Sequence, residues 1–122
     1  MIGAGNLGHA LLQNFPFSQN GFTVDAAFDV DPTLVGTSIN GVPVRSMNEL
    51  DEFIRSHPVD VVSLTIPQHV AQEMADRLIA LGIRGFWNFT NIELSSTDPV
   101  VQFENIHFAD SLLTLSYRIA NR

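Results

Sequence analysis

Residues 3–8 read Gly3-Ala-Gly5-Asn-Leu-Gly8, which matches the pattern G-x-G-x-x-G of a dinucleotide-binding turn. In such a turn Gly3 permits the tight bend, Gly5 lets the backbone approach a pyrophosphate, and Gly8 lets the next helix pack closely on a sheet. The pyrophosphate then lies on free N–H groups at the positive end of that helix. The pattern predicts a strand, a phosphate-binding turn and a helix, although a turn kept for structural reasons alone would read the same.

The sequence that follows the turn supports a nucleotide site. Residues 22–28 read FTVDAAF and predict a strand, and Asp29 follows directly, at the spacing of an acidic residue that holds a ribose hydroxyl. A carboxylate at this position accepts from a 2′-OH and repels a 2′-phosphate, so we expect NAD(H) to be preferred over NADP(H). Asp31 stands before Pro32 and is better explained as a turn or capping residue.

The rest of the chain alternates predicted helices and strands. The patterns favour helices over residues 6–13, 46–56 and 68–81, and strands over residues 22–28, 41–44, 59–66, 85–90 and 100–108. Such alternation predicts an α/β fold of Rossmann type, a parallel sheet with helices on both faces. Only Met1 and Ile2 precede the glycine turn, so the first strand is expected to be truncated relative to a longer parent protein.

The C-terminal segment has apolar residues at helical spacing. Phe108, Leu112, Leu115 and Ile119 predict an amphipathic helix, so we expect a nucleotide-binding domain over residues 1–108 and a C-terminal helix over residues 109–122. The apolar stripe must be buried, either on the chain's own sheet or on a second subunit. Periodicity does not distinguish these two arrangements.

Two strand ends are expected beside the nucleotide, because open α/β sheets bind ligands outside the carboxyl ends of their strands. Thr65, Ile66 and Pro67 end the apolar run of residues 59–66, and we expect them to line the nicotinamide half. Asn88 closes the next predicted strand on the same side. Each of these endings could also terminate a strand without contacting any ligand.

Composition excludes several other classes of function. The net charge of −7 disfavours DNA binding by this polypeptide, and the absence of cysteine excludes disulfides and thiolate chemistry. The four histidines lack metal-ligand spacing, and no nucleophile stands beside a general base. No apolar run is long enough for a membrane span, so we expect a cytoplasmic protein. The sequence predicts nucleotide binding without catalysis.

Several blocks of the sequence resemble the family of redox-sensing transcriptional repressors called Rex. These blocks cover most of the chain: GAGNLGHALL (3–12), AAFDVDP (26–32), GVPV (41–44), LTIP (64–67), AQEMADRLIALGIRGFWNFT (71–90) and LLTLSY (112–117). The resemblance implies an NADH/NAD⁺ sensor that forms a homodimer through a swapped C-terminal helix. It also implies that DNA is bound only by an N-terminal winged-helix domain, which these residues do not include.

The resemblance also implies which residues hold the cofactor NAD. The pyrophosphate would lie on the glycine turn, the adenosine ribose on Asp29 and Val30, and the nicotinamide beside the end of the apolar strand. The complete predicted set is Gly3, Ala4, Gly5, Asn6, Leu7, Gly8, Asp29, Val30, Thr65, Ile66, Pro67, Asn88 and Phe108. The alternatives are a CoA-binding domain protein, which shares a glycine turn, and a small NAD-dependent oxidoreductase.

Overall fold

The computed structural model describes residues 1–121, except for the side chains of residues 108–111. Its α-helices are α1 (Asn6–Asn14), α2 (Leu50–Ser56), α3 (Gln68–Ala80) and α4 (Phe108–Ala120). Two 3₁₀ turns, η1 (Ser18–Asn20) and η2 (Met47–Glu49), accompany them. The strands are β1 (Ala27–Asp29), β2 (Ser38–Ile39), β3 (Val42–Ser46), β4 (Val62–Leu64), β5 (Gly85–Asn88) and β6 (Gln102–Asn105).

The strands form two parallel groups that Ile2 joins. β1 pairs with β3, and β4 pairs with β5, which pairs with β6, all in parallel. Ile2 bridges Phe28 of β1 and Leu64 of β4, also in parallel. The spatial order is therefore β3, β1, Ile2, β4, β5, β6, with β2 antiparallel on the outer side of β3. This is the strand order of a doubly wound Rossmann sheet, so the predicted fold class is confirmed.

Helices cover both faces of the sheet, as the alternation of segments predicted. On one face, side chains of α2 and α3 such as Leu50 and Leu78 form a core with Phe28 and Leu64. On the other face, Leu12 of α1 belongs to a second core, which it shares with Ala4, Ala27, Ile39 and Val44. Residues of successive strand positions enter opposite cores because strand side chains alternate in direction. Burial of these apolar side chains is the main stabilising term of the domain.

Four of the predicted strands are shorter in the structure, and the one expected over residues 85–90 ends at Asn88. Residues 22–28 were expected to form one strand and residues 59–66 another, but only Ala27–Asp29 and Val62–Leu64 do so. Between these two strands the chain supplies a single bridging residue, Ile2. A strand needs a neighbour for its backbone hydrogen bonds, so the flanking segments 22–26 and 58–61 remain without a ladder. The strand expected over residues 100–108 likewise shortens to β6, and α4 begins at Phe108.

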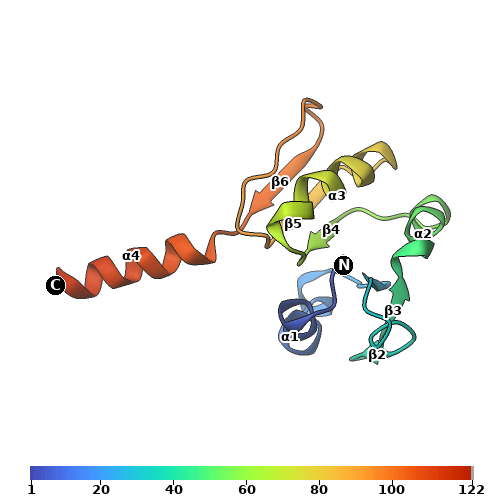
Figure 1. Ribbon diagram of the computed structural model, residues 1–122, viewed down its shortest axis with the longest axis horizontal. Helices are drawn as coiled ribbons and strands as arrows, with labels where there is room; N and C mark the ends of the chain where they lie inside the picture. The colour runs from blue at the N-terminus through green and yellow to red at the C-terminus, as the bar shows by residue number, and fades with distance from the viewer. Residues whose placement is uncertain (122) are drawn as a thin grey trace.

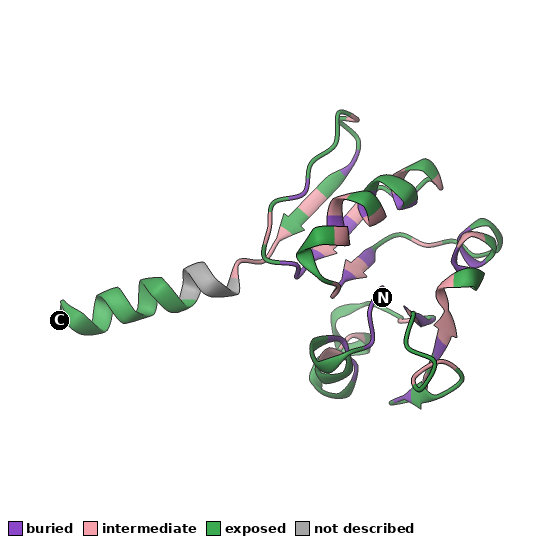
Figure 2. Cartoon of the chain, viewed as in Figure 1, coloured by how far each residue is buried: buried purple, intermediate pink, exposed green. Residues whose placement is uncertain are grey.

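The last helix differs from the others because it leaves the domain. Figure 1 shows α4 extending away from the sheet and from the other helices, and Figure 2 shows its described side chains exposed along its length. The apolar members of this exposed set are Leu112, Leu113, Leu115, Tyr117 and Ile119. The helix therefore does not pack on the chain's own sheet. Among the described residues, no helix has the length and apolarity that a membrane span requires.

Candidate nucleotide-binding site

Two of the three glycines of the turn are required by close packing. Gly3 has a φ of 95°, and a Cβ at this position would overlap the carbonyl oxygen of Thr65. A Cβ on Gly8 would overlap the carbonyl oxygen of Gly3. Gly5 is different, because a Cβ there would meet no atom within 4 Å. Gly3 and Gly8 thus fix the turn, whereas the backbone at Gly5 faces open space where a ligand can approach.

The first turn of α1 is open to an anion. Gly5 is the N-cap residue of this helix, no side chain caps it, and no acidic residue lies in its first turn. Gly5, Asn6 and Leu7 are exposed, while Ala4 and Gly8 are buried beneath them. The N–H groups at a helix N-terminus carry partial positive charge and favour phosphate. These residues fit the pyrophosphate of a dinucleotide.

Asp29 is bound directly to the glycine turn. Its Oδ2 accepts a hydrogen bond from the Ala4 N–H at 2.7 Å, and its Oδ1 accepts from the Asp31 N–H at 2.9 Å. The sequence predicted that Asp29 contacts a ribose. It did not predict the hydrogen bond between Ala4 and Asp29, which joins residues 25 positions apart. Each carboxylate oxygen keeps acceptor capacity for a hydroxyl. Beside it, Val30 is 83% exposed and offers an apolar surface at the same edge.

Asp31 has the turn-forming contacts that its position before Pro32 suggested. Its Oδ1 accepts from the Thr33 N–H at 2.9 Å and from the Thr33 hydroxyl at 2.7 Å. These hydrogen bonds to the hydroxyl and the backbone of Thr33 favour the ionised carboxylate and lower the pKa of Asp31. Asp31 therefore stabilises the turn after β1, and Asp29 is the carboxylate directed at the glycine turn.

Thr65 connects the end of β4 to the same turn. Its hydroxyl donates to the Gly3 carbonyl oxygen at 2.6 Å and lies 3.1 Å from the Ile2 carbonyl oxygen. Ile66 approaches Gly3 as well, and Pro67 is the N-cap residue of α3. The predicted nicotinamide-side residues thus lie next to the glycine turn. No local sequence signal could have revealed the Thr65 contact, because it joins residues 62 positions apart.

Asn88 is placed at the same edge, but its side chain points into the protein. It is fully buried, and its amide donates to the Ile92 carbonyl oxygen and to Asn105 Oδ1, both at 2.7 Å. Its own Oδ1 accepts from the N–H and the hydroxyl of Thr90. An amide side chain has two donor hydrogens and two acceptor lone pairs, and all are used here. Asn88 therefore organises the loop after β5, and its side-chain hydrogen-bonding positions are all occupied; its contact with a cofactor stays a prediction.

The remaining predicted contact is Phe108. It is the first residue of α4, and its side chain lies outside the described part of the structure, so its contact with a cofactor stays a prediction. In the described residues no three His, Asp or Glu side chains gather as they would around a metal ion. The assembled site consists of the glycine turn, Asp29 and the end of β4.

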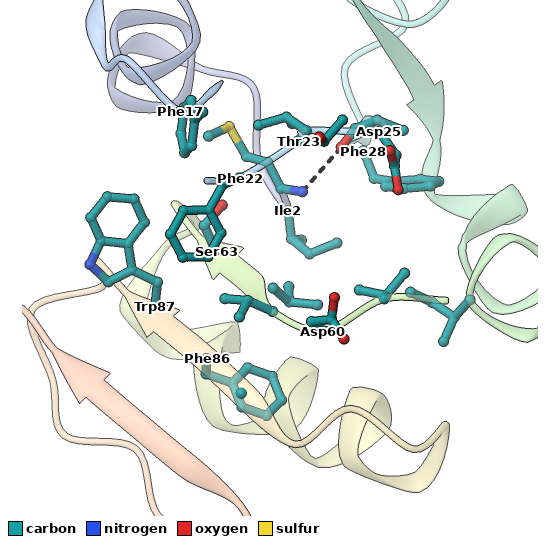
Figure 3. A pocket seen from close by; sticks show the side chains of 18 of the residues that line it. Ile2, Phe17, Phe22, Thr23, Asp25, Phe28, Asp60, Ser63, Phe86 and Trp87 are labelled. Carbon is teal, nitrogen blue, oxygen red and sulfur yellow. Dashed lines mark hydrogen bonds between the residues drawn. The ribbon is translucent and has the colours of Figure 1, made fainter. Parts of the chain in front are cut away.

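A cavity of about 940 Å³ lies at the opposite edge of the sheet, where the strands begin. Figure 3 shows aromatic side chains, among them Phe22 and Trp87, around it, with Asp25 and Asp60 also on its wall. The Met1 ammonium group donates to the Ala26 carbonyl oxygen at 3.1 Å, and burial lowers its pKa to about 6. The cavity lies between the two segments that form no ladder. It is separate from the glycine turn, whose edge carries the dinucleotide features.

The sequence model of the CoA binding domain family matches residues 1–92, which include the glycine turn, Asp29 and Asn88. The chain belongs to the CoA-binding domain family. Within it, the resemblance to Rex is confirmed by relatives described as redox-sensing transcriptional repressor Rex. The relative from Caldanaerobacter subterraneus subsp. tengcongensis is 43% identical over 119 residues, and that from Caldicellulosiruptor saccharolyticus is 44% identical. Each match covers 98% of this chain and 53% or 54% of the relative.

Solved structures give the same result. The chain is similar to RSP, a Rex-family repressor, with a TM-score of 0.90 and 41% sequence identity over 98% of this chain and 57% of RSP. RSP has also been solved in complex with β-NADH, and with β-NAD⁺ and operator DNA. The chain spans about half the length of the curated relatives that it matches.

Proposed function

We propose that this chain is the NADH/NAD⁺-sensing domain of a redox-responsive transcriptional repressor of the Rex type. The observation that carries the proposal is the hydrogen bond from the Ala4 N–H to Asp29 Oδ2 at 2.7 Å. This hydrogen bond places a carboxylate that can bind ribose hydroxyls next to a turn whose N–H groups can bind phosphate. A dinucleotide site requires both features. The similarity to RSP, which was solved with β-NADH and with β-NAD⁺, supports the same cofactor.

The roles of the residues follow from their placement. The exposed N–H groups of residues 5–7 would hold the pyrophosphate, Asp29 and Val30 the adenosine ribose, and residues 65–67 the nicotinamide side. NAD supplies a nicotinamide ring that exists in an oxidised or a reduced form. The chain's own residues would bind and orient the dinucleotide and are assigned no proton-transfer or nucleophilic role. The proposed function is therefore sensing and not enzymatic turnover.

Calorimetric titration of the purified chain with NADH, NAD⁺, NADPH and CoA tests the cofactor assignment. NADH should bind more tightly than NADPH, because Asp29 accepts from a ribose 2′-OH and repels a 2′-phosphate. CoA is the alternative that the family description raises. Its ribose 3′-phosphate would also approach this edge, where the carboxylate disfavours it. CoA bound more tightly than NADH would overturn the redox-sensor proposal.

We propose further that the chain forms a homodimer through α4. The exposed apolar side chains on this helix, including Leu112, Leu115 and Ile119, need a partner surface, because each contributes roughly 1.5 to 3 kcal/mol when it is fully buried. Exchange of an identical helix gives a closed two-fold dimer. Light scattering should report a dimer for the intact chain and loss of that dimer after Leu112→Gln with Leu115→Gln. A monomeric intact chain would contradict the assembly.

DNA binding is assigned to another part of the parent repressor, because this chain carries a net charge of −7. A cytoplasmic location goes with that role. A mobility-shift measurement with duplex DNA at physiological salt should show no binding by the isolated chain. A shift at submicromolar concentration would place a DNA-binding surface within these residues.

A further inference from the structure

One buried side chain joins the loop after β5 to the segment that leads into α4. The Asn88 amide donates to the Ile92 carbonyl oxygen within the loop and to Asn105 Oδ1 at the end of β6. Its Oδ1 accepts from the N–H and the hydroxyl of Thr90, which lies in the same loop. Because all four hydrogen-bonding positions are used and Asn88 is fully buried, none of these groups can exchange its partner for water.

Asn105 fixes the other side of this connection. It is the last residue of β6, and its Oδ1 accepts from Asn88 at 2.7 Å and lies 3.4 Å from the Leu94 N–H. The next residue, Ile106, donates its N–H to the Asn88 carbonyl oxygen at 2.8 Å. Figure 1 shows the ends of β5 and β6 meeting where the chain turns into α4, which begins at Phe108. The chain therefore enters α4 two residues after the Ile106 hydrogen bond to Asn88.

The loop after β5 also reaches the candidate nucleotide site. The Phe89 N–H donates to the Leu64 carbonyl oxygen at 3.0 Å. The residue after Leu64 is Thr65, whose hydroxyl donates to the Gly3 carbonyl oxygen at 2.6 Å. Hydrogen bonds, together with the peptide bonds between neighbouring residues, therefore connect the glycine turn, the end of β4 and the loop after β5.

We propose that the Asn88–Asn105 pair is the positioning element that couples nucleotide binding at this edge to the direction of α4. The inference rests on the proposed function, because it concerns how that site would act on the dimer helix. The Asn88 amide is fully buried, and leaving a buried amide unpaired is costly. A shift of the loop on nucleotide binding therefore moves Asn105 and the start of α4 with it. Asn88 and Asn105 themselves need not touch the nucleotide.

Distance measurements between labels test this coupling. The sequence contains no cysteine, so Glu73→Cys on α3 and Thr114→Cys on α4 provide two specific labelling positions, both exposed and outside the apolar stripe of α4. Spin-labelled chains are mixed with an excess of unlabelled chains, so that a dimer carries labels on one subunit only. Double electron–electron resonance then reports the distance between the two labels within that subunit. In this background NADH should shift the distance distribution. Asn105→Ala should bind NADH and lose that shift, whereas Asn105→Asp keeps an acceptor oxygen for the Asn88 amide and should restore it.

Asn105→Ser is the second test variant, because the serine side chain is too short for its hydroxyl to reach the Asn88 amide. Thermal unfolding identifies which variants are folded. A folded Asn105→Ala or Asn105→Ser chain that keeps the full NADH-dependent shift would overturn the coupling. So would Asn105→Asp behaving like Asn105→Ala, or a parent chain that binds NADH without any shift. A parent chain that binds no NADH would instead overturn the proposed function.

Discussion

The two edges of the sheet differ in how far hydrogen bonds fix the segments that form them. At the carboxyl edge, hydrogen bonds of 2.6–3.1 Å join Ala4 to Asp29 and Thr65 to the glycine turn, and they join Asn88 to the loop after β5 and to the end of β6. At the amino edge, the segments on either side of Met1 form no ladder and enclose a cavity. A site that must hold a ligand in one orientation needs fixed donors and acceptors. The fixed edge is therefore the better candidate for recognition, although a cavity lies at the open edge.

The largest expected effect separates two glycines of the same turn. Gly8→Ala should destabilise the domain by about 3 kcal/mol, because its Cβ would overlap the Gly3 carbonyl oxygen in a packed backbone. Gly5→Ala should leave the unfolding free energy within about 0.5 kcal/mol, since its Cβ meets open space and its φ of −73° suits alanine. NADH binding should nevertheless weaken in Gly5→Ala. Urea unfolding and calorimetry measure the two effects, and equal stability losses would break the distinction.

A second prediction concerns the amino edge in a polypeptide with a free amino group at Met1. The pKa of that group is 8.0 when unfolded and about 6 when folded, because burial disfavours the charged form. Between these two values the unfolded chain binds more protons than the folded chain does. The free energy of unfolding therefore rises with pH across this window, and the same gain is lost as the pH falls back to about 6. The gain is about 2 to 3 kcal/mol for two pKa units.

Urea unfolding at several pH values between 5.5 and 8.5 measures this gain. The matched control is the same chain with an acetylated N-terminus. The difference between the two chains isolates the amino group. An identical pH profile for the two would show that the Met1 amino group is solvated in the folded chain.

A third prediction separates the two roles of Asp29. Asp29→Ala removes the acceptor of the Ala4 N–H and the charge, so NADH affinity should fall by about 2 kcal/mol, the usual contribution of a hydrogen bond to a charged group. Asp29→Asn keeps an acceptor oxygen for Ala4 but loses the charge that repels a 2′-phosphate. It should retain more NADH affinity and show a smaller preference over NADPH. An unchanged NADH-to-NADPH ratio in both variants would remove Asp29 from ribose recognition.

The sequence predicted the features of the fixed edge that depend on local chemistry. Glycine spacing located the turn, apolar periodicity located α1 and α3, and the acidic residue after β1 located Asp29. Predicted α-helix bounds at 6–13 and 68–81 differ from the observed ones by a single residue each. These features follow from nearest-neighbour sterics and from amphipathic patterns, which one sequence displays.

Features that depend on distant partners were not predictable in the same way. Asn88 looked like a ligand contact because it ends a strand, but Thr90, Ile92 and Asn105 occupy its whole hydrogen-bonding capacity. The strand predicted over residues 22–28 has suitable β propensity, yet propensity cannot supply a neighbouring strand. Tertiary contacts decided both outcomes.

The smallest expected effect tests whether the two edges are independent. Phe22 lines the amino-edge cavity and is 53% exposed, so Phe22→Ser removes little buried surface and should change stability by no more than about 0.5 kcal/mol. NADH affinity should remain within about twofold of the parent value, because Phe22 shares no partner with the glycine turn or Asp29. Urea unfolding and NADH titration of the same preparation measure both quantities. A tenfold loss of NADH affinity in a chain of unchanged stability would mean that the cavity and the nucleotide site act together, and the contrast between a fixed and an open edge would no longer explain recognition.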